Sequence, residues 1–97
     1  LILNRGNYCT SKSVISRGGI SGTVTDIRII IKTALDKRAS GIILAHNHPS
    51  GNLRPSNADK TITTRIKEAA ALFDITVLDH LIVTNSGYLS FADEGIL

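Results

Sequence analysis

Two histidines and one aspartate are the residues of this sequence whose types and spacing best suit a metal ion. His46 and His48 lie two positions apart at the end of an apolar run. Side chains at positions i and i+2 of an extended segment point the same way, so both imidazoles can reach one point. Asp59 follows after a loop and can fold back toward them. Two neutral imidazoles and one carboxylate suit zinc.

Three protein ligands leave the fourth zinc position for water, which is the mark of a catalytic rather than a structural site. The water's pKa would fall to about 7, so it would be a usable nucleophile at neutral pH. Pro49 and Pro55 stiffen the loop between the histidines and the aspartate and lower the entropy that is lost when it orders.

A structural interpretation of the same residues remains open. Ser56-Asn57-Ala58-Asp59 resembles a capping box, in which Ser56 caps a helix and Asp59 reaches back to it. A histidine in a loop is usually a surface residue, but two at this spacing after a buried strand are uncommon. The histidines favour the metal interpretation over simple capping.

The rest of the chain predicts alternating strands and helices around these residues. The segment 26–38 fits a helical stripe better than a strand, and its length without a turn signal favours a helix. The run 41–45 reads as a strand buried on both faces. The expected strands are 1–3, 13–17, 41–45, 75–84 and 88–91, and the expected helices are 26–38 and 56–73. This alternation predicts an α/β sandwich with a central sheet of mixed direction.

Length and composition limit the alternatives. The chain has 97 residues, the size of one small domain, and its only cysteine, Cys9, excludes an internal disulfide. We expect a cytoplasmic protein with no membrane-spanning segment, because no apolar run approaches the roughly 18–20 residues required. The net charge is +3, but the basic residues are scattered and aromatic residues are few, so nucleic-acid binding has little support. The absence of methionine suggests a domain truncated at its N-terminus.

The motif resembles a known family of metalloproteases. His46-x-His48-Pro49 followed by Ser56-x-x-Asp59 is similar to the metal motif of JAMM (JAB/MPN) proteins, and the string from His46 to Asp59 resembles their bacterial RadC branch. The flanking segments also resemble that branch, and they are Ser21-Gly22-Thr23-Val24, Ile42-Ile43-Leu44-Ala45 and Leu78-Asp79-His80-Leu81-Ile82-Val83. The resemblance covers nearly the whole chain.

The resemblance implies a fold and a set of roles. The fold would be a three-layer, cytidine-deaminase-like α/β sandwich, with Zn²⁺ on His46, His48 and Asp59. The Ser56 hydroxyl would stabilise the oxyanion of a tetrahedral intermediate. The family also uses a glutamate as the base, but Glu68 is expected on the opposite helix face and Glu94 matches nothing catalytic. We therefore expect that glutamate before Leu1.

The leading hypothesis is a zinc hydrolase that acts on a peptide or isopeptide-like amide of an unknown peptide or protein substrate. One alternative is a DNA-repair-associated RadC protein that acts on or near nucleic acid. Another is an MPN-type binding module without turnover. His80 is either a core histidine or a partner that orients a metal ligand, and Asn47 and Ser50 contact either the site or the loop backbone; the sequence leaves these roles open.

Overall fold

The computed structural model describes residues 1–6, 8–12 and 26–97. The strand expected at 13–17 lies outside these residues. The elements in chain order are β1 (Ile2–Leu3), β2 (Cys9–Ser11), α1 (Ile27–Asp36), β3 (Gly41–Asn47), α2 (Asn57–Ala71), β4 (Thr76–Thr84) and β5 (Gly87–Ser90). The other expected elements are therefore present, with ends that differ by a few residues.

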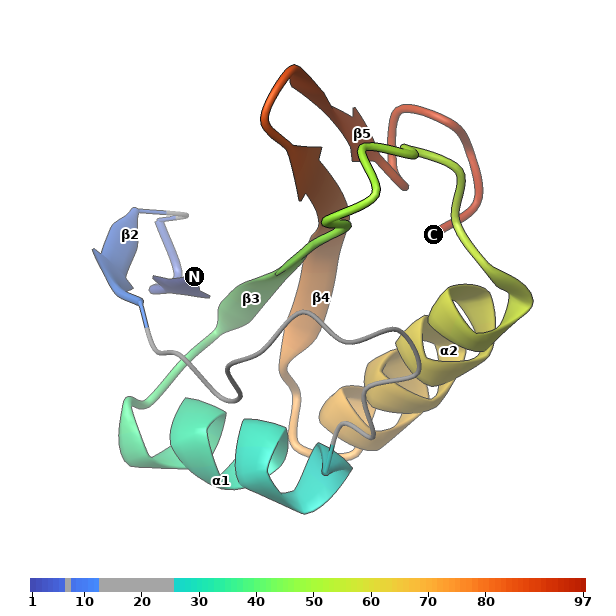
Figure 1. Cartoon of the computed structure of the whole chain (residues 1–97). Helices are drawn as coiled ribbons and strands as arrows, with labels where there is room; N and C mark the ends of the chain where they lie inside the picture. The colour runs from blue at the N-terminus through green and yellow to red at the C-terminus, as the bar shows by residue number, and fades with distance from the viewer. Residues whose placement is uncertain (7, 13–25) are drawn as a thin grey trace.

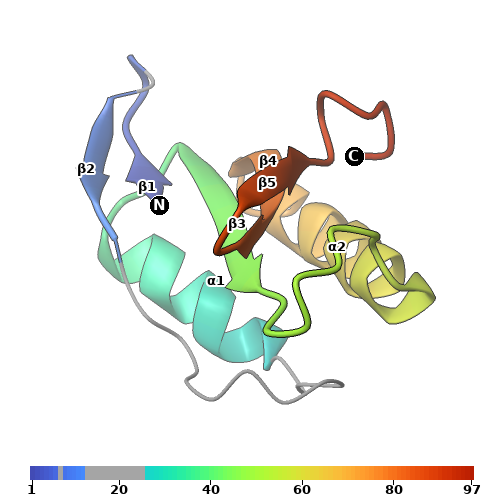
Figure 2. The same cartoon turned by 45° about the horizontal axis from the view of Figure 1, so that its top comes forward.

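The five strands form one mixed sheet in the order β2-β1-β3-β4-β5. β3 and β4 lie side by side and run parallel, whereas the other neighbouring pairs are antiparallel. The parallel pair is connected through α2, because parallel neighbours need a crossover rather than a tight turn. Figure 1 shows β3 and β4 at the centre of the sheet, and Figure 2 shows β2 and β5 at its two edges.

Helix α1 confirms the helical interpretation of the ambiguous segment. Asp26 is its N-cap, and its side chain accepts a hydrogen bond from the backbone N–H of Arg28 at 3.0 Å. The helix buries Ile30, Ile31 and Ala34, which share one face at helical spacing. The helix stops at the C-cap Lys37, and Arg38 follows with a positive φ of 54°.

Both helices share one hydrophobic core with the sheet. The core cluster consists of Ile2, Ile30, Ile31, Ala34, Ile42, Ile66, Ala70, Ile75 and Val77. The helices also contact each other, so the described residues form the sheet and one helical layer, two of the three expected layers. The expected α/β class with a mixed central sheet is confirmed.

The expectation that the 41–45 strand is buried on both faces is wrong. Gly41 and Ile42 are buried, Ile43 and Leu44 are half-buried, and Ala45 is exposed. The strand begins in the core and leaves it toward its carboxyl end, where it carries His46. In the described ranges, neither helix is both long and apolar enough to cross a membrane.

Candidate metal centre

The carboxyl end of β3 brings the two histidines together. His46 lies inside the strand and His48 directly after it, where the backbone N–H of His48 donates to the carbonyl of Val83 on β4. This contact holds the chain extended, as the i, i+2 argument requires. The Nε2 atoms of His46 and His48 lie 2.9 Å apart. The structure therefore brings both predicted imidazoles to one point.

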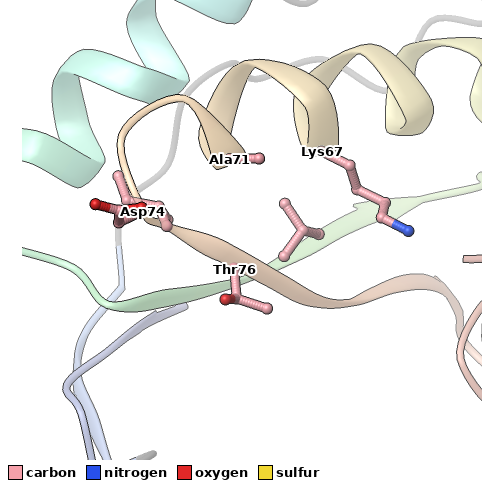
Figure 3. Close-up of a pocket in the computed structure, with 6 residues that line it drawn as sticks. Lys67, Ala71, Asp74 and Thr76 are labelled. Carbon is pink, nitrogen blue, oxygen red and sulfur yellow. The ribbon is translucent and has the colours of Figure 1, made fainter.

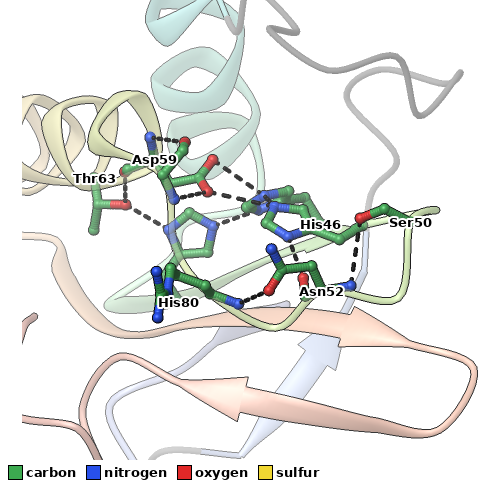
Figure 4. A network of polar contacts seen from close by, with 9 residues as sticks. His46, Ser50, Asn52, Asp59, Thr63 and His80 are labelled. Carbon is green, nitrogen blue, oxygen red and sulfur yellow. Dashed lines mark hydrogen bonds and ion pairs between the residues drawn. The ribbon is translucent and has the colours of Figure 1, made fainter.

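Asp59 completes the group from the first turn of α2. Its Oδ1 lies 3.3 Å from Nε2 of His46, and its Oδ2 lies 3.4 Å from Nε2 of His48. All three side chains are half-buried, and one donor atom of each lies within 4.8 Å of the others. The residues expected as metal ligands thus meet, although they come from two elements and a loop (Figure 4).

The distances suit a tetrahedral ion. Zinc binds imidazole nitrogen at about 2.0–2.1 Å, so neighbouring donors of a tetrahedral site lie about 3.3–3.4 Å apart. Oδ1 of Asp59 has about that separation from Nε2 of His46 and Oδ2 has it from Nε2 of His48, whereas the two Nε2 atoms lie closer together, at 2.9 Å. The donor set and its spacing therefore fit such a metal.

The capping box is also present, and it holds the carboxylate in place. The backbone N–H of Ser56 donates to Oδ2 of Asp59 at 2.8 Å, and the backbone N–H of Asp59 donates to Oγ of Ser56 at 3.0 Å. Oδ1 of Asp59 stays directed at His46. The two interpretations of these residues are thus compatible, because the cap fixes the position of the carboxylate relative to the imidazoles.

Each histidine is anchored through its second ring nitrogen. Nδ1 of His48 lies 2.7 Å from the backbone oxygen of Asn52, and Nδ1 of His46 lies 2.8 Å from Nε2 of His80. His80 is only 5% exposed and stacks on Phe91, with ring centroids 4.6 Å apart. Contacts of this kind set the tautomer and orientation of a metal-binding histidine.

Burial and nearby charges shift the pKa values of His46, Asp59 and His80. Burial is the main cause that lowers the pKa of His46 below its ordinary value; the Asp59 carboxylate opposes this effect, and His48 adds to it. Burial acts to raise the pKa of Asp59, but hydrogen bonds from Ser56 and the two nearby histidines together lower it. Burial lowers the pKa of His80 to about 4, with His46 adding to the effect. A neutral imidazole on His46 and an ionised carboxylate on Asp59 are therefore favoured at neutral pH, and these are the states that bind metals.

The loop between the ligands is ordered by its own hydrogen bonds. Gly51 adopts a positive φ of 80°, which a residue with a side chain rarely adopts, and its N–H donates to the carbonyl of His48 at 3.0 Å. The Ser50 hydroxyl accepts from the backbone N–H of Asn52 at 3.3 Å, so it contacts the loop backbone. Asn47 is exposed at the end of β3.

Ser56 is exposed next to the group and is the N-cap of α2. Its oxygen accepts the hydrogen bond from Asp59, and this contact leaves the hydroxyl proton free to donate elsewhere. The helix-capping role is therefore observed in the structure. It does not conflict with the expected role of Ser56 toward an oxyanion, which stays a prediction.

Neither glutamate of the chain belongs to this group. Glu68 is exposed on α2, and Glu94 is exposed in the turn after β5. Two cavities of the described residues also lie elsewhere. One of about 360 Å³ contains Lys67, Asp74 and Thr76 in its lining (Figure 3), and one of about 450 Å³ lies between α1 and α2. The group of His46, His48 and Asp59 therefore lies outside both cavities, at the end of β3, the following loop and the start of α2.

Sequence reasoning missed one buried residue near the site. Thr63 is 2% exposed, and its Oγ1 lies 2.5 Å from Nδ1 of His80. It follows Asp59 by one helical turn and lies in the buried stripe that continues through Ile66 and Ala70. A polar residue in an otherwise apolar stripe, one turn after a candidate metal ligand, was the available signal.

Comparison with known proteins agrees with the motif. The family described as RadC-like JAB domain matches residues 1–96. A UPF0758 protein of Flavobacterium johnsoniae is 53% identical over 96 residues, which are 99% of this chain and 42% of that protein. A UPF0758 protein of Nitrosococcus oceani is 54% identical over 97 residues, which are 100% of this chain and 43% of that protein.

UPF0758 protein YfjY of Escherichia coli is 47% identical over 97 residues, which are 100% of this chain and 61% of that protein. The chain thus spans less than two thirds of the length of each of these relatives. Because the family match covers almost the whole sequence, this chain belongs to the family of RadC-like JAB domains, as its motif predicts.

Proposed function

We propose that this chain binds one zinc ion through His46, His48 and Asp59 and that the centre serves the hydrolysis of a peptide or isopeptide-like amide. The observation that carries the proposal is the convergence of two Nε2 atoms and a carboxylate, with contacts of 2.9–3.4 Å. Membership in the JAB family, which includes metallohydrolases, supports the reaction class.

Each residue of the proposed centre would have its own role in the reaction. When bound, zinc acts as a Lewis acid and lowers the pKa of the water that it binds. His46, His48 and Asp59 hold it, and the capping box fixes the Asp59 carboxylate. The hydroxyl of Ser56, whose proton is free of its contact with Asp59, would donate to the oxygen of the amide as negative charge develops there.

The proposed reaction also needs a base, which the family resemblance gives as a glutamate. Neither Glu68 nor Glu94 fits this role, because both are exposed and neither belongs to the group of His46, His48 and Asp59. We assign it to a segment of a longer protein. β1 runs antiparallel to β3 with Ile2 opposite Ile42 and Leu3 opposite Gly41. If a longer chain continued this strand before Ile2, each added residue would lie one position further along β3 toward His46.

Because neither Glu68 nor Glu94 belongs to the group, a second candidate is a metal-binding module without turnover. Zinc titration of the purified chain tests metal binding. We expect one zinc per chain in the wild type and in the loop control Arg54→Ala, and no bound zinc in His48→Ala. Equal zinc binding by all three proteins would refute the ligand assignment.

A cleavage assay then distinguishes the hydrolase from the metal-binding module. The zinc-loaded chain would be incubated with fluorogenic peptide amides and with a peptide that carries an isopeptide bond on lysine. Cleavage that is lost in both His48→Ala and Ser56→Ala would support the hydrolase. Stoichiometric zinc without cleavage, both here and in a longer protein that carries an upstream glutamate, would favour the binding module.

A further inference from the structure

We propose that Thr63 and His80 are positioning residues that fix the tautomer of His46, so that its Nε2 atom presents a lone pair to the metal. This inference rests on the proposed metal centre. It follows from the direction of three consecutive hydrogen bonds that lead from the backbone of Asp59 to the imidazole of His46 (Figure 4).

Thr63 determines which atom donates in each of these hydrogen bonds. Its Oγ1 lies 2.7 Å from the backbone oxygen of Asp59, and a carbonyl oxygen can only accept, so the hydroxyl donates its single proton there. The same Oγ1 lies 2.5 Å from Nδ1 of His80. Because the hydroxyl proton is already used, Nδ1 of His80 must be the donor in this second contact.

The proton on Nδ1 of His80 determines the rest of the relay. A neutral imidazole with a proton on Nδ1 carries a lone pair on Nε2. Nε2 of His80 lies 2.8 Å from Nδ1 of His46, so His46 donates from Nδ1 and keeps its own lone pair on Nε2. That Nε2 is the atom directed at His48 and Asp59.

His48 reaches the same state through a simpler contact. Its Nδ1 lies 2.7 Å from the backbone oxygen of Asn52, which can only accept, so the proton of His48 is also on Nδ1. In neutral rings, two lone pairs then face each other at 2.9 Å, an arrangement that is unfavourable unless a proton or a cation lies between them. His80 thus accepts the Nδ1 proton of His46, as the backbone oxygen of Asn52 accepts that of His48.

Burial holds the relay in one geometry. Thr63 is 2% exposed and His80 is 5% exposed, and Phe91, which is 0% exposed, stacks on the His80 ring. Water therefore has little access to compete for these hydrogen bonds. The relay also connects two ligands from different elements, because it begins at the backbone of Asp59 on α2 and ends at His46 on β3.

The tautomers can be measured directly in the metal-free chain. Long-range ¹H–¹⁵N correlation spectra of ¹⁵N-labelled histidine at neutral pH distinguish a protonated from an unprotonated ring nitrogen. We expect the proton on Nδ1 in both His46 and His80. A proton on Nε2 of His80, or mainly on Nε2 of His46, would overturn the proposal whether or not the chain binds zinc.

Zinc affinity, measured by competition with a chromogenic chelator, tests the consequence. His80→Phe keeps a ring against Phe91 but removes the acceptor, and we expect zinc affinity to fall about 10–100-fold. His80→Gln, whose side-chain oxygen can accept from His46, should recover most of the loss. Wild-type zinc affinity in His80→Phe would overturn the inference, whereas a wild-type chain that binds no zinc would refute the proposed function itself.

A second pair of variants keeps the test decisive if His80→Phe does not fold. Thr63→Val removes the hydroxyl with little change in volume, and Thr63→Ser retains it. We expect the fraction of His80 with its proton on Nδ1 to fall in Thr63→Val and to stay at the wild-type value in Thr63→Ser. The same His80 tautomer fraction in both variants would contradict the assigned direction of the relay.

Discussion

Nδ1 of His46 lies 2.8 Å from Nε2 of His80, a contact that joins the carboxyl end of β3, where the candidate metal ligands meet, to the middle of β4. The parallel register places His80 opposite Leu44, two residues before His46 on the same side of the strand. The position on β4 behind the ligand is therefore occupied by a side chain that can hydrogen-bond to it. A candidate metal ligand and the residue that hydrogen-bonds to it thus come from neighbouring strands of one sheet.

Replacing Asp59 by asparagine tests the metal function of a residue that also serves the cap. The amide oxygen of Asp59→Asn can still accept from the backbone N–H of Ser56, but the negative charge toward His46 and His48 is lost. We expect zinc binding to weaken at least about tenfold, while the metal-free chain loses about 0.3–1 kcal/mol of stability from the helix dipole. Isothermal titration and denaturant unfolding measure the two effects.

The matched control for this charge removal is Asp36→Asn, which removes an exposed carboxylate paired with Lys32 at the end of α1. It should bind zinc like the wild type. If Asp59→Asn also kept wild-type zinc affinity, Asp59 would be a capping residue only.

Ser56→Ala separates stability from metal binding. Loss of the N-cap oxygen leaves the backbone N–H of Asp59 without this partner, and we expect the free energy of unfolding to fall by about 1 kcal/mol. Zinc stoichiometry should not change. Ser56→Thr retains a capping hydroxyl and should stay within a few tenths of a kcal/mol of the wild type; urea unfolding of the three proteins checks this order.

The hydrogen bonds of the Asp79 carboxylate predict a pH dependence of stability. Its carboxylate accepts from the backbone N–H groups of His80 and Ala92 and from the Ser90 hydroxyl. Burial acts to raise the pKa of Asp79, but these hydrogen bonds outweigh it and lower the pKa below its ordinary value of 3.8. The stabilisation is therefore present at neutral pH and is lost as the pH falls from about 4 through the lowered pKa.

The variant Asp79→Asn should lose this contribution. Hydrogen bonds to a charged group are worth about 1.5–3 kcal/mol, so we expect a loss of that order at pH 7 and a smaller difference from the wild type at acid pH. Urea unfolding across pH 3–7 measures it, with the exposed Asp93→Asn as the control. A difference from the wild type that does not shrink toward low pH would contradict the assignment to the ionised carboxylate.

Metal binding should stabilise the folded chain. A ligand at one hundred times its dissociation constant adds about 2.7 kcal/mol, and for a domain of this size that raises the melting temperature by roughly 10–20 °C. Thermal unfolding with zinc, and again after addition of EDTA, should show the increase and its reversal. His46→Ala should show no increase; an equal increase in that variant would place the zinc elsewhere.

The sequence was sufficient to predict that His46, His48 and Asp59 meet and to predict most elements; their role as metal ligands stays a prediction. His46, His48 and Asp59 could be identified because each depends on local rules: an extended i, i+2 pair and the first turn of a capped helix. The capping box was predicted for the same reason. The helix at 27–36 could be distinguished from a strand because its buried residues follow the helical period.

Local sequence patterns could not predict the long-range contacts. The partner of His46 is 34 positions away, and only the parallel register of β3 and β4 shows that His80 lies behind it. The burial of Thr63 depends on how α2 packs against β4. Likewise, the apolar run 41–45 read as fully buried, because local hydropathy does not show where a strand leaves the core.

The most direct test of the metal centre is a crystal of the zinc-loaded chain, with an anomalous difference map measured at the zinc absorption edge. We predict one peak per chain, at about 2.0–2.2 Å from Nε2 of His46, Nε2 of His48 and a carboxylate oxygen of Asp59. No peak at this position, or a peak held by other residues, would contradict the account.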